Sequence, residues 1–225
     1  MKIIFVRHGH PNYKNDCLTE LGHLHAEAAA ERLANEKVDK IFASSCGRAY
    51  ETAEHIAARH NMDITKLDFM REMSWGKKDT EDFLHPWNCV GRWVQEGKAI
   101  LNPHWQEGTD FEGRTVTACY NKVASGFDKW LSTLGYKREG DYYRITEKND
   151  ETIMLVSHGG SSSAAIAHIF GLPFTFVCRT IAPDYTAITV VDFKGETGEL
   201  TSPQFEIVND ARHIKGVAIE NYFGN

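Results

Sequence analysis

The sequence predicts an α/β protein in which a mostly parallel central sheet is covered by helices on both faces. Three short apolar segments, 3–6, 38–43 and 152–156, have the continuous hydrophobic character of strands buried on both faces. Each segment is followed by a polar or glycine-containing loop and then by a stretch with helical spacing. This order favours a three-layer α/β/α sandwich with right-handed crossovers between parallel strands.

The first predicted strand ends abruptly at Arg7, His8 and Gly9. Open α/β sheets bind ligands beyond the carboxyl ends of their strands, so these residues suit a pocket floor. Arginine offers a planar set of donors for phosphate oxygens, and a histidine can be a neutral base or nucleophile near neutral pH. The alternative is that Arg7 pairs with a carboxylate and that His8 is an ordinary buried histidine. A binding site therefore requires further polar residues from elsewhere in the chain.

The later elements follow from apolar spacing and from capping residues. Four stretches are expected to be helices: 19–36, 49–60, 115–134 and 162–170. Thr19 is the expected N-cap of the first helix, and Gly171 is expected to end the fourth. Three segments near the end alternate like edge strands and are expected to include antiparallel additions to the sheet: 174–177, 187–193 and 204–208.

The length of 225 residues predicts one domain, 1–225, with a helical insertion at roughly 77–112. The insertion carries Phe83, Trp87, Trp93 and Trp105 among many charged residues. It is expected to cover one end of the sheet and to govern substrate selectivity. The alternative is that these aromatic side chains only pack a small core of their own.

Composition and charge limit the classes of binding partner and the cellular compartment that we expect. A net charge of −6 argues against wholesale binding to nucleic acid or to an acidic membrane surface. Five cysteines without a C-x-x-C pair suggest reduced thiols, and with a first apolar run too short for a signal peptide they predict a cytoplasmic protein. No stretch approaches the length of a membrane span. The oligomeric state is not indicated.

Chemically active residues follow all three buried strand candidates. These residues are Arg7-His8-Gly9, the loop 44–48 with Arg48, and His158-Gly159-Gly160. Because the carboxyl ends of parallel strands meet at one edge of a sheet, two histidines and two arginines are expected to share a pocket. Arg48 lies where a helix begins, and a helix N-terminus favours anions.

The sequence resembles the histidine phosphatase superfamily, which includes cofactor-dependent phosphoglycerate mutases. The matching motifs follow the family's order over nearly the whole chain: Arg7-His8-Gly9, 18–22, 44–49 with 51–53, Arg71-Glu72 before Gly76, 156–160 and 209–213. The resemblance implies a phosphoglycerate mutase-like fold and a phosphorylated small molecule as substrate. It implies neither a metal nor a cofactor. His213, in the last motif, is expected to support the pocket structurally.

The resemblance also implies a role for each matched residue. His8 is the expected nucleophile, giving a phosphohistidine, and Arg7, Arg48 and His158 are expected to surround the phosphoryl oxygens, with Gly159 also contacting substrate. The chemistry agrees, because phosphoryl transfer needs positive charge around three equatorial oxygens. Nearby cations also disfavour protonation of a nucleophilic imidazole.

Glu72 is the expected general acid, which protonates the leaving alkoxide and then helps to activate water. A glutamate needs a raised pKa for that role. The family often places a phosphate-binding asparagine after the first motif, and Asn12 is the expected equivalent, with Asn15 as the alternative. This loop and the insertion after Glu72 both depart from the mutase pattern, which favours a phosphatase.

Several alternatives remain open. The nearest is a cofactor-dependent phosphoglycerate mutase, and another is a non-catalytic regulatory module that binds a phosphorylated ligand. His8 and His10 are spaced like a zinc-binding pair, but the neighbouring arginines would oppose a metal ion. A serine hydrolase would need a G-x-S-x-G elbow, which the sequence lacks. The substrate could be a sugar phosphate, a nucleotide or a phosphorylated protein.

Overall fold

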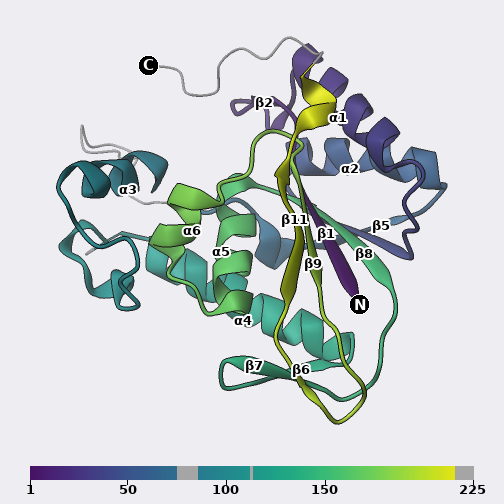
Figure 1. Cartoon of the computed structure of the whole chain (residues 1–225). Helices are drawn as coiled ribbons and strands as arrows, with labels where there is room; N and C mark the ends of the chain where they lie inside the picture. The colour runs from purple at the N-terminus through teal and green to yellow at the C-terminus, as the bar shows by residue number, and fades with distance from the viewer. Residues whose placement is uncertain (75–85, 112–113, 216–225) are drawn as a thin grey trace.

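The computed structural model describes residues 1–74, 86–111 and 114–215, and its centre is a six-stranded sheet (Figure 1). The strands lie in the order β11-β9-β1-β8-β4-β5. Their bounds are β1 Lys2–Arg7, β4 Lys40–Ser44, β5 Ile64–Leu67, β8 Thr152–Ser157, β9 Ile188–Asp192 and β11 Gln204–Asp210. Strands β1, β8, β4 and β5 are parallel, β9 pairs antiparallel with β1, and β11 pairs antiparallel with β9 at the edge of the sheet.

Strand β1 shows how the sequence forms a three-layer arrangement. Ile3 and Phe5 belong to one hydrophobic core, and Ile4 and Val6 belong to the other. Successive side chains of a strand point to opposite faces, so an unbroken apolar run fills a core on each side. Helices α1 (Glu20–Leu33) and α2 (Gly47–His60) contribute to the second core, and α4 (Val116–Thr133) and α5 (Gly159–Phe170) to the first. The predicted α/β class with a mostly parallel sheet is confirmed.

Several predicted boundaries are confirmed in detail. Thr19 is the N-cap of α1, and its hydroxyl oxygen accepts a hydrogen bond from the Gly22 amide at 3.0 Å. Gly171 ends α5 in the left-handed conformation, with φ of 64°. Helix α5 begins at Gly159, three residues earlier than predicted, because the glycine-rich segment after β8 is helical from its start. The antiparallel additions expected near the end of the chain are β9 and β11.

One prediction near the end of the chain was wrong. Residues 174–177, expected as an edge strand, lie in helix α6 (Phe174–Thr180), where Phe174 and Val177 share the buried side. Four residues with apolar ends fit a strand and a helical turn equally well, and the contact of this segment with α5 decides for the helix. Strand β5 and a second sheet, β10-β7-β6, were not predicted. The second sheet contains β6 (Tyr136–Glu139), β7 (Tyr142–Ile145) and β10 (Leu200–Thr201).

Within the expected insertion, residues 77–85, which include Phe83, and residue 112 lie outside the described residues. The side chain of Trp87 is also not described. The described part forms α3 (Pro86–Gln95) and two short 3-10 helices, η2 (Trp105–Glu107) and η3 (Thr109–Phe111), at one side of the molecule (Figure 1). Trp105 packs against Phe111 and against Phe174 of α6, each with ring centroids 5.3 Å apart. Trp93, Trp105 and Phe111 belong to the same hydrophobic core as the side chains of α4 and α5, so they do not form a separate core of their own. No helix of the described residues is long and apolar enough to cross a membrane.

Candidate active site

The predicted site residues gather at the carboxyl ends of the parallel strands. Arg7 ends β1 opposite Ser157 of β8, so His8 and His158 follow neighbouring strands at the same level. Their ring centroids lie 5.1 Å apart. Both imidazoles are fully buried, and the guanidinium-bearing residues Arg7 and Arg48 are only 4% and 7% exposed. The structure therefore brings together the two histidines and two arginines that the sequence singled out.

Hydrogen bonding defines the protonation pattern of His8. Its Nδ1 lies 2.6 Å from the Gly9 carbonyl oxygen, which can only accept a hydrogen bond. Its Nε2 receives a hydrogen bond from Arg48 Nε at 3.3 Å, and a guanidinium can only donate. The neutral tautomer with hydrogen on Nδ1 satisfies both contacts. It leaves the lone pair of Nε2 facing the arginine side of the pocket.

The electrostatic surroundings hold both imidazoles neutral. Burial lowers the pKa of His8 well below its ordinary value, and the Arg7 and Arg48 charges lower it further. Burial likewise lowers the pKa of His158 well below the ordinary value, with His8, Arg48 and Arg7 adding to the effect. An unprotonated imidazole among cations is the form that can attack an electrophile.

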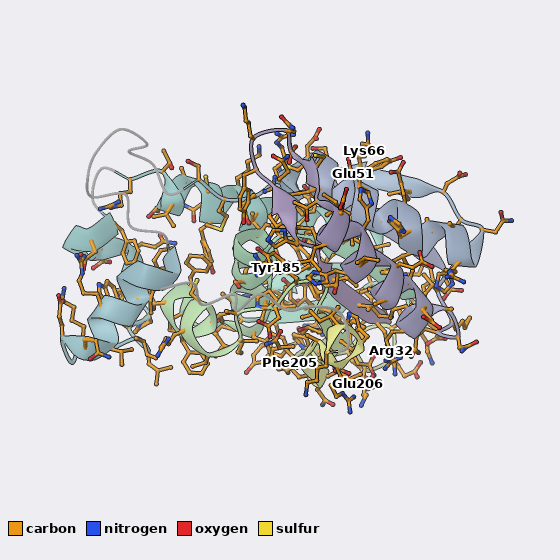
Figure 2. The ribbon with its side chains drawn as sticks, turned by 90° about the horizontal axis from the view of Figure 1, so that it is seen from above. Arg32, Glu51, Lys66, Tyr185, Phe205 and Glu206 are labelled. Atoms are coloured by element: carbon orange, nitrogen blue, oxygen red, sulfur yellow. The ribbon has the colours of Figure 1, made fainter. Side chains whose placement is uncertain are left out.

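Different contacts hold the two guanidinium groups. Arg7 Nη1 donates to the Pro183 carbonyl oxygen at 2.8 Å, and its guanidinium carbon lies 4.5 Å from the centroid of the Tyr185 ring. Figure 2 looks down on this end of the molecule, with Tyr185 near the middle. Arg48, in the first turn of α2, donates through Nη1 to Asp16 Oδ1 and through Nε to His8. Pro183 and Tyr185 thus hold the Arg7 guanidinium, whereas Asp16 and His8 hold that of Arg48.

His158 is positioned from one side of its ring. Its Nε2 lies 2.8 Å from Ser44 Oγ, at the end of β4, and that oxygen also accepts from the Cys46 amide at 3.2 Å. Its buried Nδ1 has no hydrogen-bond partner among the described residues. Buried polar atoms are rarely left unpaired, so this nitrogen is available to a ligand in the pocket.

Glu72 follows the 3-10 helix η1 (Asp68–Met70) and reaches the start of α5. Its Oε1 accepts from the Gly160 amide at 3.1 Å and from the Met73 amide at 2.9 Å. A Cβ atom at Gly160 would lie 2.6 Å from this oxygen, so a side chain there would displace the carboxylate. Glu72 is partly buried, and burial raises its pKa above the ordinary value despite the Met73 amide and the two arginines.

The remaining expected residues lie nearby, in different settings. Gly159 is the buried first residue of α5. Asn12 lies in a short hairpin formed by β2 (Pro11–Asn12) and β3 (Cys17–Leu18), where its Oδ1 accepts from the Asn15 amide at 3.2 Å. That contact stabilises the turn. His213 Nε2 lies 3.0 Å from Thr186 Oγ1. The Thr186 amide in turn donates to the His8 carbonyl oxygen at 3.4 Å.

Sequence reasoning missed four residues that position the site. Ser44 holds His158, Asp16 holds Arg48, and Tyr185 lies over Arg7. Thr52 Oγ1 accepts from the Gly9 amide at 3.1 Å and donates to the Arg48 carbonyl oxygen at 2.8 Å. Ser44 could have been found from its place at the end of a buried strand. The others act through contacts between distant segments that no local pattern reveals.

Within residues 1–74, 86–111 and 114–215, one group of side chains could hold a metal ion. Ligand atoms of His8, Glu72 and His158 all lie within 4.8 Å of one another. Two imidazoles and a carboxylate are a common ligand set for divalent transition metals. Arg7 and Arg48 both lie against this group and oppose a cation there while favouring an anion.

The fold and this cluster define an α/β protein with a histidine–arginine site at the carboxyl ends of its parallel strands. Residues 3–205 match the family model described as histidine phosphatase superfamily (branch 1). The chain belongs to that family.

Three relatives give the family context. The chain is 29% identical to phosphoserine phosphatase 1 of Hydrogenobacter thermophilus, over 76% of this chain and 77% of that one. It is 20% identical to a probable phosphoglycerate mutase, GpmB, of Proteus mirabilis, over 98% of each chain. A mutant phosphoserine phosphatase of Entamoeba histolytica, solved with phosphoserine, superposes with a TM-score of 0.66 at 19% identity, over 95% of this chain and 98% of that one. The family and its relatives point to a phosphatase or mutase enzyme.

Proposed function

We propose that this protein is a metal-independent phosphatase that hydrolyses phosphomonoesters through a phosphohistidine on His8. The observation that carries the proposal is the state of His8: a fully buried, neutral imidazole whose Nε2 lone pair faces the Arg48 guanidinium. An anionic phosphoryl group drawn to the two arginines would meet an unprotonated nucleophile. That combination suits phosphoryl transfer without a metal.

The first half of the reaction forms the phosphohistidine. His8 Nε2 attacks phosphorus while the bond between phosphorus and the ester oxygen breaks. The leaving oxygen takes the proton of the Glu72 carboxyl group, which gives a neutral alcohol and the Glu72 carboxylate. Its raised pKa makes the protonated form of Glu72 accessible for this step.

The second half returns the enzyme to its starting state. Water attacks phosphorus on the side that the alcohol has left, and the Glu72 carboxylate takes the water proton. The bond between phosphorus and Nε2 breaks, inorganic phosphate is released, and His8 is again neutral with its hydrogen on Nδ1. The Gly9 carbonyl oxygen, 2.6 Å from Nδ1, holds this tautomer through both halves.

The remaining groups stabilise charge on the transferring phosphoryl group. Arg7 and Arg48 supply two guanidinium groups whose geometry fits phosphoryl oxygens. In the proposed tautomer of His158, the Ser44 hydroxyl donates to Nε2 and the otherwise unpartnered Nδ1–H donates to a phosphoryl oxygen. Asn12 can contribute only through its Nδ2 donors, because its Oδ1 accepts from the Asn15 amide and a phosphoryl oxygen offers no hydrogen.

The substrate class that we propose is a phosphorylated small molecule whose alcohol portion carries an acidic group. Arg71 precedes Glu72 and lies near enough for its charge to lower the pKa of His158. Its exposed guanidinium donates through Nη1 to Ser45 Oγ at 3.2 Å, and no described carboxylate forms an ion pair with it. A carboxylate on the substrate would complement that cation. Phosphoserine and 3-phosphoglycerate therefore lead the list of compounds to test.

The test is a phosphate-release screen over a panel of metabolite monoesters, run in parallel with and without EDTA. The proposal predicts turnover of at least one alkyl phosphate that EDTA does not reduce. Activity that disappears with EDTA and returns with Zn²⁺ or Mn²⁺ would contradict it and assign a metal to His8, Glu72 and His158. Interconversion of phosphoglycerates without phosphate release would establish a mutase instead. Binding of phosphate esters without any turnover would establish a non-catalytic module.

A further inference from the structure

The hairpin formed by β2 and β3 lies against the first turn of α2, which contains Arg48. Leu18 of the hairpin donates its amide to Glu51 Oε2 at 2.6 Å, which fastens the hairpin to the helix (Figure 2 labels Glu51). Asp16 lies in this hairpin with φ of 51°. Its carbonyl oxygen would be 2.1 Å from a Cβ atom at Gly47, so only glycine allows the two backbones to approach this closely.

The Asp16 carboxylate uses both oxygens on the start of α2. Oδ2 accepts from the Gly47 amide at 2.9 Å, and Oδ1 accepts from Arg48 Nη1. A carboxylate at a helix N-terminus is favoured by the free amides and by the helix dipole. The same carboxylate thus anchors the backbone of the helix and one edge of the guanidinium.

Arg48 is consequently held at two points of a rigid plane. Nη1 is held by Asp16, and Nε donates to His8 Nε2 at 3.3 Å. The exposed Tyr13 ring lies beside the guanidinium, with its centroid 5.3 Å from the guanidinium carbon. Because a guanidinium is planar, fixing two of its nitrogens also fixes the direction of the third.

We propose that Asp16 is a positioning residue, which aims the Arg48 guanidinium at His8 and at the phosphoryl group bound there. This inference rests on the proposed function, since it deepens the assignment of Arg48. Different groups hold the two guanidinium groups: a backbone carbonyl and an aromatic ring contact Arg7, whereas a carboxylate contacts Arg48. Misplacing a charged group by about 1 Å can cost roughly a hundredfold in rate.

The Asp16 side chain is 41% exposed, so water reaches the carboxylate, whereas the Arg48 side chain is only 8% exposed. A positioning role predicts a loss of catalysis without a loss of fold. Asparagine is the appropriate replacement at residue 16, because it tolerates the left-handed conformation and keeps an oxygen for the Gly47 amide. It removes the charge that holds Arg48.

The experiment compares Asp16→Asn with Glu139→Gln. The control removes a carboxylate–guanidinium pair with Arg144 in the β6–β7 hairpin. We expect Asp16→Asn to lower kcat roughly 10- to 100-fold with little change in KM, and to weaken orthovanadate binding by a similar factor, because vanadate can adopt the five-coordinate geometry of the transition state. Glu139→Gln should change neither value. Both variants should unfold within a few degrees of the wild type.

A double-substitution cycle tests whether Asp16 acts through Arg48. In the Arg48→Lys background, a lysine cannot be held in the same plane, so adding Asp16→Asn should cost less than about threefold. Losses that simply multiply would overturn the proposal, as would an Asp16→Asn variant with unchanged or increased kcat. If the wild type binds vanadate but hydrolyses no ester, the proposed function fails while vanadate affinities still decide the role of Asp16.

Discussion

At the phosphate end of the candidate site, His8 and His158 follow neighbouring strands, whereas at the leaving-group end Glu72 lies in a segment outside the sheet. The register of β1 and β8 fixes where the two imidazoles lie. Glu72 is instead held by backbone amides, one of them from Gly160 on α5. The comparison teaches that the sheet positions the two imidazoles, while Glu72 is anchored separately. In the proposed function, the first group handles the phosphoryl group and Glu72 handles the leaving group.

The largest effect is expected at the phosphate end. His8→Ala removes the nucleophile and should lower kcat by roughly 10⁴-fold or more on every substrate. His23→Asn is the matched control, since His23 is an exposed histidine of α1 whose ring Nδ1 lies 3.1 Å from His55 Nε2, not against His8. Steady-state hydrolysis of phosphoserine and of p-nitrophenyl phosphate measures both. A His8→Ala variant within tenfold of the wild type would refute the assignment.

Loss of a guanidinium should also affect all substrates alike. Arg7→Ala is expected to lower kcat/KM roughly 10²- to 10³-fold, because it removes donors aimed at developing negative charge. The factor should be the same for alkyl and aryl phosphates, since the phosphoryl group is common to both. A loss confined to one leaving group would place Arg7 at the other end of the site.

The variant Glu72→Gln should show that the leaving-group end of the site acts independently of the phosphate end. We expect a loss of roughly 10²- to 10³-fold on phosphoserine, whose alkoxide needs a proton, and less than about tenfold on p-nitrophenyl phosphate, whose leaving group does not. Rates on a series of phosphate esters with leaving groups of increasing acidity provide the measurement. Equal losses across the series would remove Glu72 from the acid role.

The pH profile should reflect the same division. Burial, reinforced by Arg7 and Arg48, holds the pKa of His8 well below 6.5, so the nucleophile stays unprotonated in mildly acidic solution. Burial raises the pKa of Glu72 above 4.5, and its acid role needs the protonated form. The ratio of wild-type to Glu72→Gln kcat/KM on phosphoserine, in which substrate ionisation cancels, should therefore fall as pH rises. A ratio that increases with pH would contradict this assignment.

The smallest effect is expected from Ser44→Ala. The hydroxyl holds His158 from outside the pocket, so its loss should cost about 1 kcal/mol, or roughly fivefold in kcat/KM. The loss should not depend on the leaving group, because His158 acts at the phosphate end. A strong dependence on the leaving group would link His158 to Glu72 instead.

The contrast between the two ends also explains what the sequence could predict. Arg7, His8 and His158 follow apolar runs that are recognisable as buried strands, and parallel strands must bring their carboxyl ends to one edge. Their convergence was therefore predictable before any resemblance was considered. The family resemblance was needed for Glu72, which no periodic pattern distinguishes from a surface carboxylate.

Other features depended on contacts that local sequence does not encode. Asp16 meets Arg48 only because the hairpin folds onto α2, and Tyr185 reaches Arg7 from the loop before β9. Residues 174–177 formed a helix where an edge strand was expected, because packing against α5 outweighed a four-residue pattern. Long apolar elements were predictable, and short segments with long-range partners were not.

The most direct test of the central claim is rapid-quench trapping of the covalent intermediate. The enzyme is mixed with ³²P-labelled substrate, quenched in alkali, in which phosphohistidine survives, and digested to locate the label. The account predicts label on the peptide that contains His8, formed at least as fast as turnover and absent from His8→Ala. Label on another residue, or turnover that forms no covalent phosphoenzyme at any time, would contradict it.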